Sequence, residues 1–505
     1  MKKIIIGLLF LFIKTISSAQ EGHQITVNVK NCNDTVMYLA FYQFDILPIA
    51  DTCKKIVNGK VIFKGIKTLD RGMYFLVNQN KEKCFDFFIS DSNQKMVMSA
   101  DKNDWVNSLK CSTHKENEDF FSYIKFMTVK NKEFTEQCAK SKGMSIKDSI
   151  AFINEKSKLF NETMIGYEKS VFEAHKGTFF GDVMNLRTEK SAIDIPKASN
   201  GRPDSNFTYN YYKNHYWDSV NFKDDGIIHT LFFADKMKKY FSSVIIQNPD
   251  TIIVEIDRIM SKTKVGSMMQ KLLLVHFLIT AESSKIMSFD KVFVHIIKKY
   301  IKAGMANGMY DEKTIEKIIE RGRILEPIII GSIGPDLFMI DTTGNKTIVK
   351  MGFDTVKTSL AANKLYSDNA QKLASTFVSL HSIKADYLVL VFWDVDCGHC
   401  KIEVPKLLNE YHALQKENYN IKVFSVYTKH EFSKYKQYIL DNKLDWINVY
   451  DGINANNITE KYDIFSTPVL YLLDKNKRIK AKRFSVEQLK DIVKQMEREY
   501  KLDKK

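Results

Sequence analysis

The feature that most constrains this chain is a pair of cysteines, Cys397 and Cys400, placed just after a strongly apolar segment. That segment, YLVLVFW at residues 387–393, has the length and the β-branched and aromatic content of a buried strand. We expect a helix to begin at Cys397, where unsatisfied N–H groups and a partial positive charge stabilise a thiolate. The pattern therefore predicts that Cys397 is a nucleophile and that Cys400, one turn further, is buried and resolves a mixed disulfide.

Two other uses of a C-x-x-C pair compete with exchange chemistry. A structural zinc site needs two such pairs, or one pair with spaced histidines, and the sequence has no second C-x-x-C. An inert disulfide between Cys397 and Cys400 would close a very short loop at a helix start, which is a strained and easily reduced arrangement. We therefore expect thiol–disulfide exchange, with no bound cofactor or metal beyond the redox-active disulfide Cys397–Cys400.

The first nineteen residues predict a secretory signal peptide. Lys2 and Lys3 are followed by an apolar run at residues 4–13, and Ser17 and Ala19 lie at the −3 and −1 positions of a cleavage site. The apolar run is too short to span a bilayer about 30 Å thick. The mature protein is thus expected to be exported, in the periplasm or cell envelope, and soluble after cleavage.

The length of the chain indicates how many domains it has, and its charge bears on whether it binds nucleic acid. A chain of 505 residues exceeds the usual size of one domain. Its formal net charge is +15, but the lysines are scattered and no binding motif accompanies them, so no nucleic-acid partner is expected. Five further cysteines have a pairing that the sequence leaves open: Cys32, Cys53, Cys84, Cys111 and Cys138.

The periodicity of apolar residues changes twice along the chain and predicts three domains. Residues 20–114 alternate as strands do, with a tight-turn signal at Asn58-Gly59, and predict an antiparallel β-sandwich. Residues 115–328 show helical spacing and predict an α-helical domain. Residues 329–505 alternate strand and helix, which indicates an α/β fold.

Two motifs in this last region resemble a known family. FWDVDCGHCKIEVP, residues 392–405, is similar to the active site of thioredoxin-fold proteins, and STPVLYLLD, residues 466–474, is similar to their Thr-cis-Pro strand. The distance between the motifs, together with Glu403 and Pro405, resembles the TlpA/ResA-like branch and its pattern C-x-x-C-x-x-E-x-P. The resemblance covers about residues 331–500 and implies a C-terminal thioredoxin fold. The earlier regions more weakly resemble the β- and helical domains that precede such thioredoxins in exported Bacteroidetes proteins.

The resemblance also implies roles for individual residues. Pro468, in a cis peptide bond, would expose the backbone of Thr467 to an extended substrate chain. Trp393 completes the predicted substrate-binding set, although packing beneath the active-site helix is its first expected role. Glu403 would accept or relay the proton of Cys400 as a general base.

The dipeptide Gly398-His399 is that of protein disulfide isomerases, and a charged His399 would favour the thiolate and a more oxidising disulfide. Asp394 and Asp396 add negative charge nearby and oppose this effect. The direction of exchange is therefore open, although the TlpA/ResA resemblance favours net reduction.

The sequence thus predicts an exported oxidoreductase that acts on protein thiols and disulfides and receives electrons from a membrane or thioredoxin-like donor. The alternatives are a disulfide isomerase or oxidase, and an envelope binding protein in which residues 20–325 capture a ligand and the redox pair is secondary. A peroxidase is disfavoured because Asp394 and Val395 stand where the pattern T-x-x-C is expected. The physiological substrate and the oligomeric state stay open.

Overall fold

The computed structural model describes residues 22–44, 46–91 and 93–502, so the predicted signal peptide at residues 1–19 lies outside the described residues. The chain divides into two compact units, one ending at His276 and the other running from Phe277 to the C-terminal end. The division falls inside helix α8 (Met268–Ser283). Among the described residues, no helix is both long enough and apolar enough to cross a membrane.

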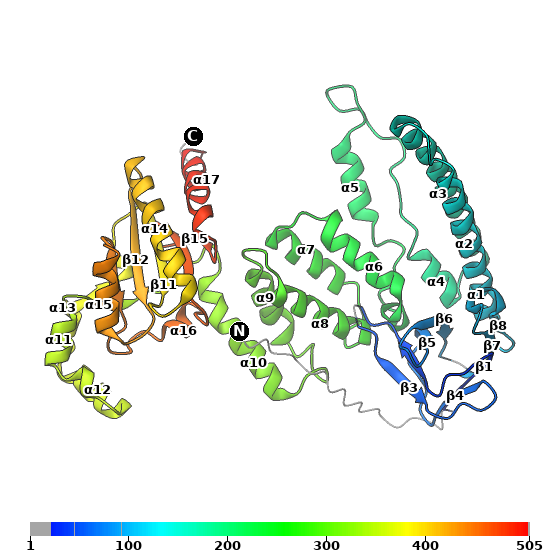
Figure 1. Cartoon of the computed structure of the whole chain (residues 1–505), viewed down its shortest axis with the longest axis horizontal. Helices are drawn as coiled ribbons and strands as arrows, with labels where there is room; N and C mark the ends of the chain where they lie inside the picture. Colours follow the sequence, from blue (N-terminus) through cyan, green and yellow to red (C-terminus); the bar gives the residue numbers. More distant parts are fainter. Residues whose placement is uncertain (1–21, 45, 92, 503–505) are drawn as a thin grey trace. The chain divides into compact units, whose positions relative to one another are not determined.

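The first unit begins with eight strands in two four-stranded sheets (Figure 1). The strands are β1 (His23–Lys30), β2 (Met37–Phe41), β3 (Ile49–Cys53), β4 (Lys60–Gly65), β5 (Gly72–Val77), β6 (Lys83–Ile89), β7 (Lys95–Asp101) and β8 (Lys110–Cys111). The sheet orders are β4-β1-β7-β8 and β3-β2-β5-β6. All neighbours are antiparallel except β1 and β7, which are parallel. The predicted turn before β4 is present, with positive φ at both Asn58 and Gly59.

Helices make up the rest of the first unit. They are α1 (Trp105–Ser108), α2 (Lys115–Ala139), α3 (Ile146–Ala174), α4 (Phe179–Asn185), α5 (Ser205–His215), α6 (Leu231–Lys239) and α7 (Pro249–Met260). The two longest, α2 and α3, form a hairpin (Figure 1). Stacked rings join them, as in the pair Phe134 and Phe160, whose centroids are 4.5 Å apart.

The second unit holds α9 (Asp290–Ile296) and α10 (Glu312–Leu325), followed by one seven-stranded sheet. Its strands are β9 (Phe338–Asp341), β10 (Phe377–Ser379), β11 (Tyr387–Trp393), β12 (Ile421–Tyr427), β13 (Ile447–Tyr450), β14 (Val469–Asp474) and β15 (Ile479–Lys482), in the order β10-β9-β13-β12-β11-β14-β15. Its helices are α11 (Asn345–Lys350), α12 (Ser359–Asp368), α13 (Ala370–Thr376), α14 (Gly398–Lys416), α15 (Phe432–Asp441), α16 (Ile458–Lys461) and α17 (Leu489–Leu502).

Strand β11 is an interior strand of this sheet, between β12, to which it is parallel, and β14, to which it is antiparallel. All seven of its residues are buried, as the apolar run predicted. A capping box formed by Ser485 and Gln488 precedes α17. The fold class is confirmed: a β-rich N-terminal region, a helical middle region and a C-terminal thioredoxin fold. The boundaries at 114/115 and 328/329 stay predictions.

Candidate active site

The site begins where β11 ends and α14 starts. Cys397 is the residue that caps the N-terminus of α14, with an extended backbone (φ −78°, ψ 120°). Its sulfur accepts a hydrogen bond from the backbone N–H of Cys400 at 3.4 Å. Its own N–H donates to the carbonyl of Asp394 at 3.2 Å. The sulfur therefore lies at the end of the helix where the unsatisfied N–H groups point, as the sequence predicted.

The two sulfurs have opposite surroundings. Cys397 is half-buried, and although burial raises its pKa, hydrogen bonds with the side chains of Thr467 and Cys400 and with the backbones of Cys400 and His399 bring that pKa below the usual value for a thiol. Cys400 is only 1% exposed, and burial raises its pKa to about 12. Both are free thiols in the structure. Of the two thiols, Cys397 is therefore the one that ionises first as the pH rises.

The segment before β14 lies directly beside Cys397. The Thr467–Pro468 peptide bond is cis. The thiol of Cys397 donates to the carbonyl oxygen of Thr467, with 3.3 Å between sulfur and oxygen. The structure therefore brings Cys397, Cys400, Thr467 and Pro468 together from two motifs distant in the sequence.

Trp393 lies beneath the site. Its side chain is fully buried, and its indole N–H donates to the hydroxyl of Ser425 at 2.7 Å. Its ring packs against Tyr438, with centroids 5.0 Å apart. A fully buried ring cannot touch a substrate in this conformation, so the position fits the packing role expected of Trp393 and not its place in the substrate-binding set.

Glu403 and His399 are the other two predicted catalytic residues. The carboxylate of Glu403 pairs with the ammonium of Lys406 on the same helix at 2.9 Å. In the described part of the chain, no hydrogen bond or ion pair joins Glu403 to Cys400. His399 is exposed. Their catalytic roles stay predictions.

Two residues that sequence reasoning missed complete the surroundings of the pair. Ser425, on β12, is fully buried and holds the indole of Trp393. Tyr438, on α15, packs its ring against Trp393, and burial raises its pKa, with a smaller contribution from the charge of a Cys400 thiolate. Neither residue carries a motif, and both belong to elements distant in sequence from Cys397, so no local signal could have identified them.

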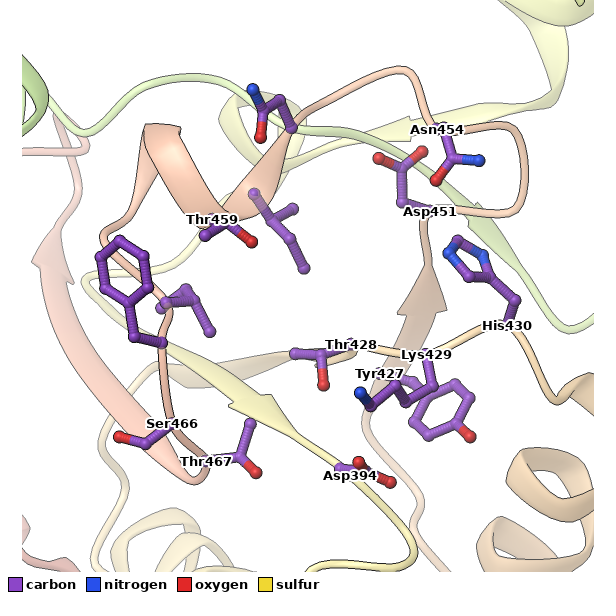
Figure 2. A pocket seen from close by; sticks show the side chains of 14 residues that line it. Asp394, Tyr427, Thr428, Lys429, His430, Asp451, Asn454, Thr459, Ser466 and Thr467 are labelled. Atoms are coloured by element: carbon purple, nitrogen blue, oxygen red, sulfur yellow. The ribbon is translucent and has the colours of Figure 1, made fainter. Parts of the chain in front are cut away.

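A cavity of about 520 Å³ lies beside Thr467 (Figure 2). Polar side chains line much of it and come from the ends of the parallel strands β11, β12 and β13: Asp394, Thr428, Lys429, His430 and Asp451. An apolar part is formed by Ile458, Ile464 and Phe465. A polypeptide bound alongside Thr467 could place a side chain with an apolar body and a polar end in this cavity.

No group of three or more His, Cys, Asp or Glu residues among the described positions is arranged to hold a metal ion. The donor set at the candidate site consists of two sulfurs on one helical turn, which suits disulfide formation.

Comparisons with known proteins agree with this geometry. Residues 363–482 match the AhpC/TSA family. Residues 23–120 and 178–320 match two domains of unknown function, DUF4369 and DUF5106. No curated protein matches the chain.

Similar solved structures include a domain of a possible thiol-disulfide isomerase from Cytophaga hutchinsonii, with 32% identity, 35% of this chain and 98% of that chain covered, and a TM-score of 0.27. The thioredoxin domain of a thiol-disulfide oxidoreductase from Bacteroides vulgatus has 24% identity, 33% and 96% coverage, and a TM-score of 0.25. A thioredoxin-like protein from Bacteroides caccae has 18% identity, 60% and 98% coverage, and a TM-score of 0.32.

The family match covers the strand and helix that carry Cys397 and Cys400 as well as the cis-proline segment. The predicted thioredoxin-fold resemblance is thereby confirmed: residues 363–482, which match the AhpC/TSA family, lie within the thioredoxin fold, and the chain is a thioredoxin-like oxidoreductase.

Proposed function

We propose that the chain is an exported thiol–disulfide oxidoreductase that exchanges disulfides with protein substrates through Cys397 and Cys400. The observation that carries the proposal is the contrast between the two sulfurs. Cys397 is accessible, and its pKa is lowered at a helix N-terminus; Cys400 is buried, with a pKa of about 12. Cys397 can thus attack a substrate disulfide, whereas Cys400 reacts only after a mixed disulfide has formed beside it.

The reaction begins when the Cys397 thiolate attacks one sulfur of a substrate disulfide. A Cys397–substrate disulfide forms, the substrate S–S bond breaks, and the other substrate sulfur leaves as a thiolate that takes up a proton. Cys400 then loses its proton and attacks the sulfur of Cys397, which releases the second substrate thiol. Two electrons have passed to the substrate, and the domain is left with a Cys397–Cys400 disulfide.

The substrate is a polypeptide that lies extended beside Thr467. The contact between Thr467 and the sulfur of Cys397 supports this placement, because the backbone of Thr467 then adjoins the reacting bond. A side chain of the bound polypeptide would enter the 520 Å³ cavity next to Thr467. Trp393 supports the site from below.

Net reduction is favoured, with electrons supplied by a membrane or thioredoxin-like dithiol donor. The alternative direction is disulfide isomerisation or oxidation. Equilibration of the Cys397–Cys400 pair against dithiothreitol and glutathione buffers decides between them. A potential near about −270 mV marks a reductase, and one above about −180 mV marks an isomerase or oxidase.

The test of the function itself is reduction of insulin disulfides by the full chain. The wild type should reduce insulin in the presence of dithiothreitol faster than dithiothreitol alone, and Cys397→Ser should abolish that acceleration. Acceleration that survives in Cys397→Ser would show that the site is wrongly assigned. Peroxide consumption without insulin reduction would favour a peroxidase.

A second candidate function, an envelope binding protein, is favoured by a cavity of about 1150 Å³ in the first unit. Arg71 lies on its wall and pairs with Asp224 at 3.1 Å and with Asp91 at 3.5 Å. Absence of any exchange activity in the purified wild type would favour this reading.

A further inference from the structure

The segment that leads to Pro468 is anchored by one buried carboxylate. Asp463 is 1% exposed and has a left-handed backbone with φ 55°. Arg321 donates one N–H group to each of its two carboxylate oxygens. Arg483 donates to the same carboxylate at 2.6 Å and to the backbone carbonyl of Asp463 at 2.8 Å. Two guanidinium groups therefore fix both the side chain and the backbone of one residue.

Arg321 comes from a distant part of the sequence. It lies on α10 (Glu312–Leu325), 142 residues before Asp463 and outside the AhpC/TSA match at residues 363–482. The next residue, Gly322, allows α10 to pack closely, because a Cβ there would lie 2.8 Å from Cδ1 of Ile297. The helix that carries Arg321 is thus held in place, and both partners belong to one compact unit.

Arg321 also contacts the wall of the cavity beside Thr467. Its guanidinium carbon lies 5.7 Å from the ring centroid of Phe465, within the range of a cation–π interaction. Phe465 is 67% exposed and lines the 520 Å³ cavity. Thr467, two residues further, contacts the sulfur of Cys397. Arg321 therefore touches the substrate-binding segment at two points, four and two residues before Thr467.

We propose that Arg321 is a positioning residue that holds residues 463–468 in the conformation that receives a polypeptide substrate. The proposal rests on the proposed function and extends the substrate-binding machinery to α10, upstream of the predicted thioredoxin domain at 329–505. A buried carboxylate cannot stay unpaired without cost, so loss of Arg321 leaves Asp463 with one partner and releases the Phe465 ring.

The expected consequence concerns binding and not sulfur chemistry. The pKa of Cys397 is lowered by groups at the start of α14 and by Thr467, none of which contacts Arg321 in the described part of the chain. Thr467 stays held by its contact with Cys397, and a displaced Phe465 would weaken the alignment of a bound polypeptide, because small shifts in positioning groups cost large factors in rate. KM for a protein substrate should therefore change more than the reactivity of the thiol.

The experiment uses the full chain carrying Arg321→Ala or Arg321→Lys, with Arg323→Ala as the matched control. Arg323 lies on the same helix but is 63% exposed and pairs with Glu320 and Glu460 at the surface. Each variant is assayed for kcat and KM in insulin reduction, for the alkylation rate of reduced Cys397 by iodoacetamide, and for thermal unfolding.

We expect Arg321→Ala to raise KM for insulin about five- to tenfold, and Arg321→Lys to raise it less, since an ammonium keeps the charge but loses the two-point contact. Alkylation of Cys397 should stay within about twofold of the wild type. Arg323→Ala should match the wild type in every measurement, because exposed ion pairs contribute little. Phe465→Ala should raise KM without lowering the unfolding temperature, since Phe465 is exposed.

An unchanged KM for insulin in both Arg321 variants would overturn the positioning role. It would be overturned equally if kcat, the alkylation rate and the unfolding temperature all fell while KM stayed the same. Should Arg321→Ala fail to fold, Arg321→Lys and Phe465→Ala decide by the same comparison. Failure of the proposed function looks different: the wild type itself would then not reduce insulin.

Discussion

Two regions of the molecule place a cysteine just before a long helix, and the proposed redox site uses only one of them. Cys111 ends β8 shortly before α2, and Cys397 caps α14. Burial raises the pKa of Cys111, but hydrogen bonds with His114 and Thr113 outweigh this effect. The pKa of Cys111, like that of Cys397, is therefore lowered from the usual value for a thiol. Cys111 is 7% exposed, however, whereas Cys397 is half-buried.

The second difference between the two regions is the presence of a second cysteine close to the first. Cys397 is followed by Cys400 one helical turn later, whereas the first turn of α2 holds no cysteine. A lowered pKa alone therefore does not make a disulfide exchanger. The sulfur must also be accessible, and a second sulfur must stand where it can resolve the mixed disulfide.

The largest expected effect tests this contrast by trapping the mixed disulfide. In Cys400→Ser the second sulfur is missing, so Cys397 should stay covalently bound to substrate polypeptides after reaction. Non-reducing electrophoresis of the full chain with insulin should show an adduct that dithiothreitol removes. The adduct should persist in Cys111→Ser/Cys400→Ser and vanish in Cys397→Ser/Cys400→Ser. The reverse pattern would make Cys111 the nucleophile and break the comparison.

A smaller effect is expected in the rate of alkylation of the reduced protein. The reactive thiolate fraction rises with pH and levels off above the pKa, so Cys397 should reach half its maximal rate below the pH of about 8.5 that is typical of a free cysteine. Cys111 should react at least about tenfold more slowly because it is buried. Peptide mapping after iodoacetamide treatment at a series of pH values measures both rates. Equal alkylation rates for Cys397 and Cys111 would show that accessibility does not distinguish the two thiols.

The third effect is a loss of stability at alkaline pH that originates at Cys400. Its folded pKa of about 12 exceeds the value of about 8.5 expected for an unfolded thiol. Its contribution to stability is therefore fully present below pH 8.5 and falls as the pH rises toward 12, because only the unfolded chain then releases the proton. Cys397 has the opposite sign: its lowered pKa contributes above the unfolded value and is lost as the pH falls.

Thermal unfolding of the reduced wild type and Cys400→Ser from pH 7 to pH 10 separates this contribution from that of the raised tyrosine pKa values, which both proteins share. The difference between the two unfolding temperatures should change above about pH 8.5. A constant difference would mean that Cys400 titrates like an unfolded thiol.

Local sequence signals predicted the parts of the site that depend on local structure. The apolar run predicted β11 over the residues that form it, and the start of α14 follows from Cys397 as cap. The pair Asn58-Gly59 predicted a turn because both residues tolerate positive φ. These features depend on neighbours within a few residues, so periodicity and residue type were sufficient.

The contacts that shape the surroundings of the site are non-local and could not be predicted in this way. The bond from Trp393 to Ser425 spans 32 residues, and the ion pair of Arg321 with Asp463 spans 142. Such pairs depend on how strands and helices pack, which the residue types alone leave open. Trp393 illustrates the result: its buried ring fits the packing role expected first, but the sequence did not indicate that Ser425 would hold its indole.

The smallest expected effect concerns Glu403, and it decides whether the cysteine pair needs a carboxylate to move the proton of Cys400. The ammonium of Lys406 holds the Glu403 carboxylate at 2.9 Å on the partly exposed side of α14. We therefore expect Glu403→Gln to lower kcat for insulin reduction by less than about threefold, against the hundredfold or more that removal of a general base costs. Lys406→Gln is the matched control.

A hundredfold loss of kcat in Glu403→Gln together with a shifted pH profile, while Lys406→Gln stays near the wild type, would establish that Glu403 relays the proton of Cys400. The deprotonation of Cys400 would then depend on a third residue, and the contrast with Cys111 would rest on that carboxylate as well as on the second sulfur.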